Sequence, residues 1–125
     1  MHRLLIVEDQ EAISFAMKRY LERSGFTVDV ASDYSEAVGF IERERYALVV
    51  SDLKLSNTSD TGGLDLVSLV RGTSPETRSV LLTAFASESV EREGKERGAS
   101  VVLRKPVPLA RLAEVLQQQL AEGAR

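Results

Sequence analysis

Three carboxylates in this sequence follow short apolar runs. Glu8 and Asp9 come directly after LLIV (residues 4–7), and Asp52 closes the run ALVVSD. A carboxylate at the end of a buried strand loses hydration, which is unfavourable unless a partner compensates for it. If the three groups lie in one pocket they repel one another, and each carboxyl has a raised pKa unless a cation neutralises them. The pattern therefore indicates a divalent cation, and oxygen ligands with open positions suit Mg²⁺.

A hydroxyl and an ammonium group stand at the ends of two later apolar runs. Thr83 follows SVLL, and Lys105 follows SVVLR. A lysine is a compact charge suited to phosphate, and a threonine hydroxyl donates to phosphoryl oxygens. Carboxylates, a metal ion, a lysine and a hydroxyl are together the equipment for moving a phosphoryl group onto a carboxylate.

Each of these residues also has a purely structural interpretation. Asp52 could cap the approach to a helix, Thr83 could bond the backbone, and Lys105 could be a surface lysine with a packed stem. Their joint occurrence at separate strand ends favours a phosphorylatable site over several coincidences. The lone His2 is interpreted as part of a solvated terminus and not as a ligand.

The elements that must position these residues alternate along the chain. Strands are predicted at residues 4–7, 26–31, 47–51, 78–84 and 100–104, each followed by a helical pattern. Such alternation with short loops calls for a parallel sheet covered on both faces. We therefore predict a flavodoxin-like, doubly wound α/β fold with a five-stranded parallel sheet, order 2-1-3-4-5, and five helices. In that order the strand ends that carry Glu8, Asp9 and Asp52 converge on one crevice.

Helix signals support this reading of the connections. Asp33 and Glu36 have the spacing of a capping box. Two sets of apolar residues recur at helical spacing: Ile13, Ala16, Met17, Tyr20 and Leu21 in the first helix, and Leu109, Leu112, Leu116 and Leu120 in the last.

Composition bounds the remaining possibilities. The 125 residues contain 43% hydrophobic and 28% charged residues, which predicts one domain over residues 1–125. The absence of cysteine excludes disulfides and thiolate zinc sites, and it fits a cytoplasmic protein. The net charge of -3, with mixed signs, argues against direct nucleic-acid binding, and no apolar run is long enough for a membrane span.

The motifs resemble those of bacterial two-component response-regulator receiver domains over the whole chain. The matching features are the acidic pair in LLIVEDQ, the aspartate in LVVSDL, the threonine in LLTA and the lysine-proline in RKP, in the family's order. The resemblance implies that Asp52 accepts a phosphoryl group from a histidine kinase or a phosphotransfer protein. The domain is then a signalling switch, an enzyme only in its own phosphorylation and dephosphorylation.

The same resemblance assigns roles around that aspartate. It implies that Asp9 and Asp52 bind Mg²⁺ together with the backbone carbonyl of Lys54, while Glu8 acts through water. Thr83 would bind a phosphoryl oxygen, and Lys105 would bridge the phosphoryl group and an acidic residue. In the family the peptide bond before the matching proline, here Pro106, is usually cis.

The segment after Asp52 departs from the family pattern. It is longer than usual, Ser56 stands where a proline is common, and the expected glycine is represented a few residues late by Gly62 and Gly63. We expect a polar excursion that is flexible before phosphorylation and affects partner choice. Lys54 and Phe85 occupy positions where the family varies its dephosphorylation rate, and a ring at Phe85 predicts a long-lived phosphoryl state.

The switch position departs as well. Val102 stands three residues before Lys105, where the family usually has a rotating aromatic residue. We expect the response to run instead through the segment after Thr83, with Phe85 as its nearest aromatic residue, and through a weak fourth helix.

Two other classes of function compete with a phosphorylated switch. A pseudo-receiver would keep the fold and bind proteins without phosphorylation, which the missing aromatic residue favours. An aspartyl phosphatase or phosphotransferase commonly needs a second carboxylate two residues after the nucleophile, where this chain has Lys54.

Output is expected through protein contacts. The chain ends about one helix after the lysine-proline pair, so we expect no output module within it. The predicted partners are the kinase, a downstream output protein or domain and, as an option, a second copy of the chain. Whether the chain is a stand-alone receiver or part of a longer protein stays open.

Overall fold

The computed structural model describes residues 2–55, 62–84 and 87–123. Five strands form one parallel sheet in the order β2-β1-β3-β4-β5. The strands are β1 (Arg3–Val7), β2 (Thr27–Ala31), β3 (Leu48–Asp52), β4 (Arg78–Thr83) and β5 (Ala99–Arg104). The helices are α1 (Glu11–Arg23), α2 (Tyr34–Arg43), α3 (Gly62–Thr73), α4 (Glu88–Arg97) and α5 (Leu109–Gly123). The predicted fold class and strand order are confirmed, and strand boundaries differ from the prediction by about one residue.

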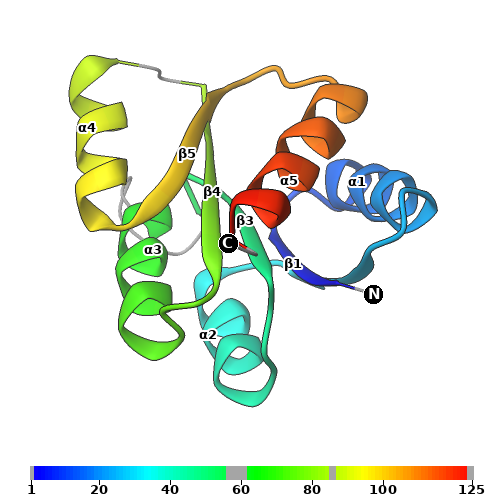
Figure 1. The fold of residues 1–125 in the computed structure, drawn as a ribbon, viewed down its shortest axis with the longest axis horizontal. Helices are drawn as coiled ribbons and strands as arrows, with labels where there is room; N and C mark the ends of the chain where they lie inside the picture. The colour runs from blue at the N-terminus through cyan, green and yellow to red at the C-terminus, as the bar shows by residue number, and fades with distance from the viewer. Residues whose placement is uncertain (1, 56–61, 85–86, 124–125) are drawn as a thin grey trace.

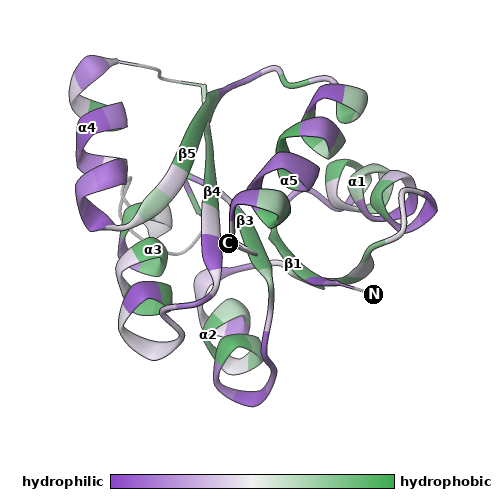
Figure 2. Ribbon diagram, viewed as in Figure 1, coloured by the Kyte–Doolittle hydropathy of each residue, from purple (hydrophilic) through white to green (hydrophobic). Residues whose placement is uncertain are grey.

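Helices cover both faces of the sheet (Figure 1). On one face, even-numbered side chains of β1 and β3 pack with α1 and α5 around residues such as Leu4, Leu48 and Leu116. On the other face, Leu5 and Val49 pack against α2 and α3. The central strands are mostly apolar, while α4 is mostly hydrophilic (Figure 2). This pattern is expected of parallel strands that are buried on both sides.

The structure contains the predicted helix signals at the start of α2 and along α5. Asp33 accepts a hydrogen bond from Glu36 N at 2.8 Å. Glu36 Oε1 in turn accepts one from Ser32 N at 3.0 Å, one residue earlier than in a standard capping box. The leucine stripe of α5 faces the core as expected, with Leu112 and Leu116 fully buried.

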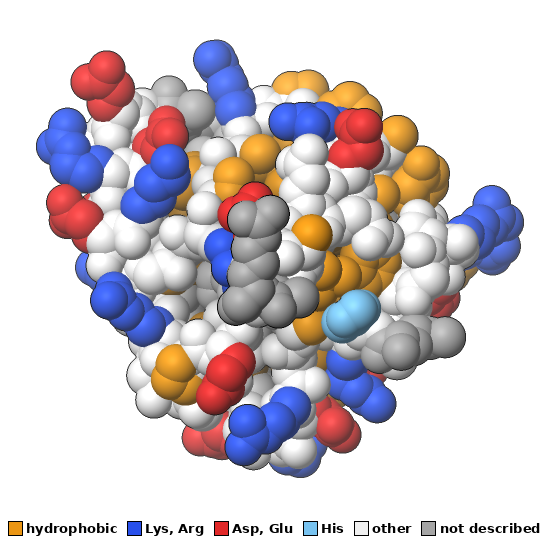
Figure 3. Space-filling model, viewed as in Figure 1, with side chains coloured by type: hydrophobic (Ala, Val, Ile, Leu, Met, Phe, Trp, Pro, Cys, Tyr) orange, Lys and Arg blue, Asp and Glu red, His pale blue; other side chains and the backbone are white. Residues whose placement is uncertain are grey.

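The core face of α1 is narrower than its apolar pattern indicates. Met17 and Leu21 are buried, but Ile13, Phe15 and Tyr20 are exposed, and these three are the exposed large hydrophobic side chains among the described residues. Figure 3 shows apolar side chains gathered toward α1 and α5, while acidic and basic side chains alternate over the rest of that face. Helix α1 therefore offers apolar surface that its own chain leaves uncovered.

A close backbone contact fixes the start of α3 against the end of β3. Gly63 N donates to the Leu53 carbonyl at 2.8 Å. A Cβ atom on Gly63 would lie 2.7 Å from Leu53 Cα and nearer still to the Asp52 carbonyl oxygen. Because backbone atoms cannot move aside as a side-chain end can, this position requires glycine.

Gly63→Ala is expected to lower the free energy of unfolding by about 2 kcal/mol or more, because overpacking against backbone displaces α3. Gly72→Ala is the matched control in the same helix, since nothing lies within 4 Å of the Cβ position there. That control should leave stability unchanged or raise it by up to about 1 kcal/mol through helix propensity. Urea denaturation measures both variants, and equal effects would contradict the contact described.

Candidate functional site

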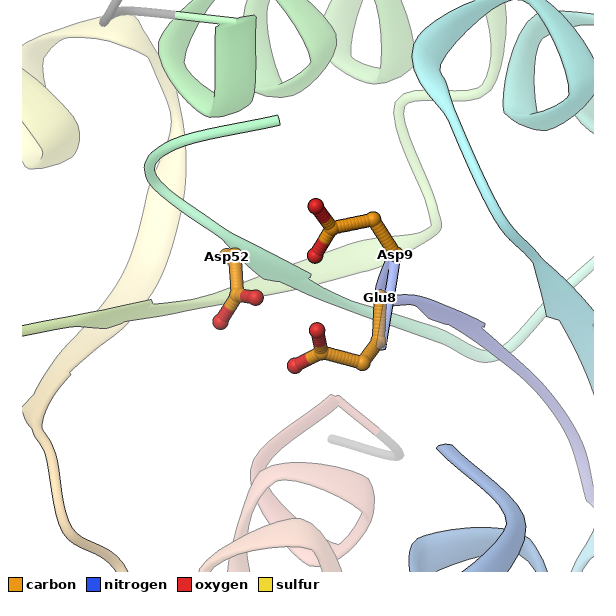
Figure 4. A group of neighbouring side chains, drawn as sticks. All are labelled: Glu8, Asp9 and Asp52. Carbon is orange, nitrogen blue, oxygen red and sulfur yellow. The ribbon is translucent and has the colours of Figure 1, made fainter. Parts of the chain in front are cut away.

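The three acidic residues meet at the carboxyl edge of the central strands. Glu8 and Asp9 directly follow β1, and Asp52 is the last residue of β3. One carboxylate oxygen of each lies within 4.8 Å of the others, and the three side chains point toward one another in Figure 4. Glu8 is 3% and Asp52 6% exposed, whereas Asp9 is open to solvent. Two of the three carboxyl groups are therefore held away from water.

Glu8 has the most perturbed environment of the group. Its backbone N–H donates to the Ala31 carbonyl at 3.0 Å, and its Oε2 accepts from Gln10 N at 3.0 Å. Burial and the adjoining Asp52 carboxylate raise the pKa of Glu8 to about 8, against the weaker opposing effect of the Gln10 hydrogen bond. At neutral pH, without a cation, this carboxyl keeps its proton.

Lys105 supplies the positive charge of the pocket. Its Nζ lies 2.6 Å from Asp52 Oδ1 and 3.9 Å from Glu8 Oε1. The Lys105–Pro106 peptide bond is cis, as the resemblance implied. Among the described residues no donor makes a well-aligned hydrogen bond to Asp52 Oδ1, although the ammonium group is close. This buried oxygen therefore keeps acceptor capacity for a further group.

Thr83 and Lys54 lie on segments that border the same pocket. Thr83 is the buried last residue of β4, next to β3 in the sheet, and its carbonyl accepts from Lys105 N at 2.8 Å. Lys54 is exposed and lies two residues beyond Asp52. The intervening Leu53 donates its N–H to the Leu82 carbonyl at 2.8 Å, which fixes how the chain leaves the strand.

The donor chemistry of this pocket suits Mg²⁺. The site offers oxygen ligands only, two of them buried, and an uncompensated acidic cluster that a divalent ion would neutralise. Asp9, at the exposed side of the cluster, leaves room for the waters that this ion retains.

One contact at the site was absent from the sequence analysis. The buried Ser51 hydroxyl donates to the Asp52 carbonyl at 2.9 Å. The available signal was a small polar residue at the end of an otherwise apolar strand. Its hydrogen bond satisfies a carbonyl close to the turn that Gly63 approaches.

Val102 lies where β5 packs against α4. Val102 is half-buried, and the Cβ position of Gly94 in α4 lies 3.0 Å from its Cγ2. Helix and strand are therefore in close contact at this point.

The predictions for Ser56 and Phe85, including the flexible excursion and the long-lived phosphoryl state, concern residues that lie outside the described part of the chain.

Comparison with known proteins decides the family. The model of the response regulator receiver domain matches residues 4–117. This chain belongs to that family. Receiver domains are signalling domains of two-component systems, with phosphorylation as their general switch and Mg²⁺ bound in the acidic pocket.

Individual relatives agree with this assignment. The receiver chain is 30% identical over 119 residues to the acid tolerance regulatory protein ActR of Rhizobium meliloti, covering 95% of this chain and 60% of that protein. A receiver domain protein from Methanospirillum hungatei superposes with a TM-score of 0.92 at 29% identity, covering 99% of this chain and 97% of the other. The chain spans about half the length of the curated relatives it matches, from 45% to 62%.

A third relative was solved in a modified state. It is a response regulator from Burkholderia pseudomallei, described as carrying a phosphorylated aspartic acid, a calcium ion and citrate. The TM-score is 0.85 at 28% identity, over 98% of this receiver and 70% of that chain.

Within the described part of this receiver, no helix is long and apolar enough to span a membrane.

The raised pKa of Glu8 predicts a pH-dependent instability. Between about pH 4.5 and 8 the unfolded chain releases this proton while the folded protein retains it, so the free energy of unfolding falls as pH rises. Glu8→Gln removes the effect and should be more stable than wild type by at least about 1 kcal/mol near pH 8 in metal-free buffer. Near pH 5 the difference should almost vanish.

Thermal unfolding with a chelator present measures this difference. Glu22→Gln, at an exposed position of α1, is the control and should follow wild type at every pH. If Glu8→Gln raised the free energy of unfolding by the same amount at every pH, the titration of Glu8 would not be the source of the gain.

Proposed function

We propose that Asp52 is the phosphoacceptor of this receiver domain and that a histidine kinase or a phosphotransfer protein supplies the phosphoryl group. The observation that carries the proposal is the contact of 2.6 Å between Lys105 Nζ and Asp52 Oδ1, within a cluster of two further carboxylates. A lysine against a buried aspartate at a strand end combines a nucleophile with the charge that its phosphorylated form needs.

The reaction follows from this arrangement. An Asp52 carboxylate oxygen attacks phosphorus, the P–N bond to the donor imidazole breaks, and the imidazole keeps the bonding electron pair and takes a proton from solvent. Lys105 then pairs with a phosphoryl oxygen, and the Thr83 hydroxyl donates to another. Because little covalent chemistry is required of the protein, these residues act by positioning and by balancing charge.

The pocket also accounts for the metal requirement. Asp9 and Asp52 would hold Mg²⁺ together with the Lys54 carbonyl, and Glu8 would act through a water molecule. When bound, the ion neutralises the phosphoryl oxygens. Support comes from the oxygen-only donor set and from the Burkholderia pseudomallei relative described with a phosphorylated aspartic acid and a calcium ion.

The readout is proposed to run through α4. Only Gly94 of this helix is buried, and Val90 is half-buried. Polar contacts hold the rest, notably Arg97 to Asp65 of α3 at 3.0 Å and Arg71 to the Glu96 carbonyl at 2.9 Å. A helix with so little apolar contact can move when the contacts of Thr83 change, without a rotating aromatic residue.

The wider role follows the family. We propose that residues 1–125 form one cytoplasmic receiver domain whose output goes through contact with a downstream protein or domain, or with a second copy of the chain, and not through direct nucleic-acid binding. Catalysis is limited to its own phosphorylation and dephosphorylation, because Lys54 occupies the place of a second carboxylate. Curated relatives that are transcriptional regulators support an output partner.

The alternative function is that of a pseudo-receiver, which binds its partners without phosphorylation. The absence of an aromatic residue at position 102, where the chain has Val102, favours it. The acidic cluster and the Lys105–Asp52 contact argue for the phosphorylated switch.

Incubation with acetyl phosphate should add one labile phosphoryl group, detected by intact-mass spectrometry. The adduct should need Mg²⁺, disappear in Asp52→Asn and fall strongly in Asp9→Asn. Asp65→Asn, at an exposed aspartate of α3, is the matched control and should be modified like wild type. No adduct, together with no measurable Mg²⁺ binding, would establish the pseudo-receiver instead.

The proposed readout predicts that α4 is the helix that responds to phosphorylation. With acetyl phosphate and Mg²⁺, backbone amide chemical shifts in α4 should change more than those in α2, which lies on the opposite side of α3 from α4. Asp52→Asn should abolish the response. Shifts confined to the ends of β1 and β3 would exclude α4 as the moving element.

A further inference from the structure

A groove of about 760 Å³ runs over the free edge of the sheet at β2, away from the carboxylate pocket. Residues of α1 line one wall of the groove, and Phe40 of α2 lines the other. The two helices cover opposite faces of the sheet (Figure 1). The aromatic side chains of the groove are Phe15, which is 61% exposed, and the half-buried Phe40. Val30 and Asp29 of β2 form the floor.

The backbone of β2 leaves hydrogen-bonding groups at this edge. Thr27 N donates to the His2 carbonyl, and the Ala31 carbonyl accepts from Glu8 N. In a parallel ladder, alternate residues bond to the same neighbour, so the peptide groups of Val28 and Val30 point away from β1. Val28 is buried, but Val30 is half-exposed and lines the groove. The floor therefore presents a donor and an acceptor to an incoming chain.

The walls carry positive charge. Arg19 stacks over the Phe15 ring at 5.6 Å, and Arg43 over the Phe40 ring at 5.1 Å. Lys18 lines the groove beside them. Within the described part of the chain, no carboxylate lies within ion-pair distance of these three cations.

The acidic groups of the groove do not balance this charge. Asp29 is engaged by the Tyr46 hydroxyl at 2.7 Å and by Arg3 at 3.3 Å, which leaves Glu11 as the acidic side chain of the lining without such partners. Burial and the hydrogen bond to Asp29 raise the pKa of Tyr46, so this phenol stays a donor. When Arg19 and Arg43, which stack on the rings of two lining residues, are counted with the lining, three cations stand against the two carboxylates Glu11 and Asp29.

We propose that this groove binds an extended, acidic and apolar peptide segment of a partner protein, which adds a short strand beside β2. Side chains of an extended chain alternate between two sides. One set would then pack on Phe15 in the α1 layer and the other on Phe40 in the α2 layer, while the peptide groups pair with Val30. Flanking carboxylates would pair with Lys18, Arg19 and Arg43. Such main-chain pairing supplies affinity, and the alternate side chains supply specificity.

A selection experiment tests the class of ligand. A random library of short peptides displayed on phage is selected on the full chain and counter-selected on the double variant Phe15→Ser/Phe40→Ser. Enriched peptides should alternate apolar with other residues and carry net negative charge. Absence of enrichment over the counter-selection, or enrichment of basic peptides, would overturn the proposal.

The best peptide is then titrated into isotope-labelled protein. Shifts should centre on Val30, Phe15 and Phe40, and the affinity should fall at least tenfold in Val30→Pro, which removes the outward N–H while keeping the hydrogen bonds to β1. An edge strand tolerates proline at such a position, and circular dichroism checks that the variant is folded. Unchanged binding to Val30→Pro would exclude strand addition.

Two further variants separate this site from other surfaces. Ile13→Ser alters an exposed apolar residue on the other flank of α1 and should bind the peptide like wild type. Asp52→Asn should also bind unchanged, because the groove does not include the carboxylate pocket. The failure of either proposal is thus distinguishable from the failure of the other.

Discussion

The mutual repulsion of three carboxylates at one sheet edge is the constraint on which the rest of this receiver depends. The strands β1 and β3 are neighbours in the sheet, and both are buried on both faces. Their carboxyl ends therefore bring Glu8 and Asp52 together, away from water. Lys105 balances part of the charge, but one ammonium cannot neutralise the cluster once all three carboxyl groups are ionised. The pocket by itself therefore carries an excess of negative charge, and a bound cation is the natural way to neutralise it.

The backbone around this pocket is as specific as its charges. Lys105 N donates to the Thr83 carbonyl, Leu53 N to the Leu82 carbonyl and Gly63 N to the Leu53 carbonyl. Each bond ties a segment that carries a site residue to a neighbouring strand or helix. The side chains of the candidate site are thereby positioned by the sheet, and a site held in this way needs little reorganisation for the proposed reaction.

Much of this arrangement could be predicted from the sequence, because the signals are strong where both faces of a strand are buried. Apolar runs such as LLIV and ALVVS indicate strands, and alternation with helices restricts the sheet to few topologies, so convergence at one edge follows. The first helix was harder to interpret. Its apolar pattern is broader than the face that Met17 and Leu21 bury, and helical spacing cannot distinguish core contact from surface left for another molecule.

Other features depend on contacts between distant segments, which periodicity does not encode. The approach of Gly63 to the end of β3 and the packing of Gly94 against Val102 are set by the helix-to-sheet distance. The raised pKa of Glu8 likewise depends on how deeply the fold buries a residue that directly follows a strand. Sequence identifies which residues meet at the edge, whereas burial decides which of them keeps its proton.

The polar attachment of α4 has a consequence for the conditions under which this domain works. The ion pairs of Arg97 with Asp65 and Glu93 lie at the surface, each partly exposed. Salt screens such pairs over about 8 Å at physiological ionic strength, and each contributes at most about 1 kcal/mol. The apolar contacts of the central strands have no such sensitivity. Ionic strength would therefore loosen one side of the molecule selectively, so that the salt content of the surroundings acts on the helix through which the readout is proposed to run.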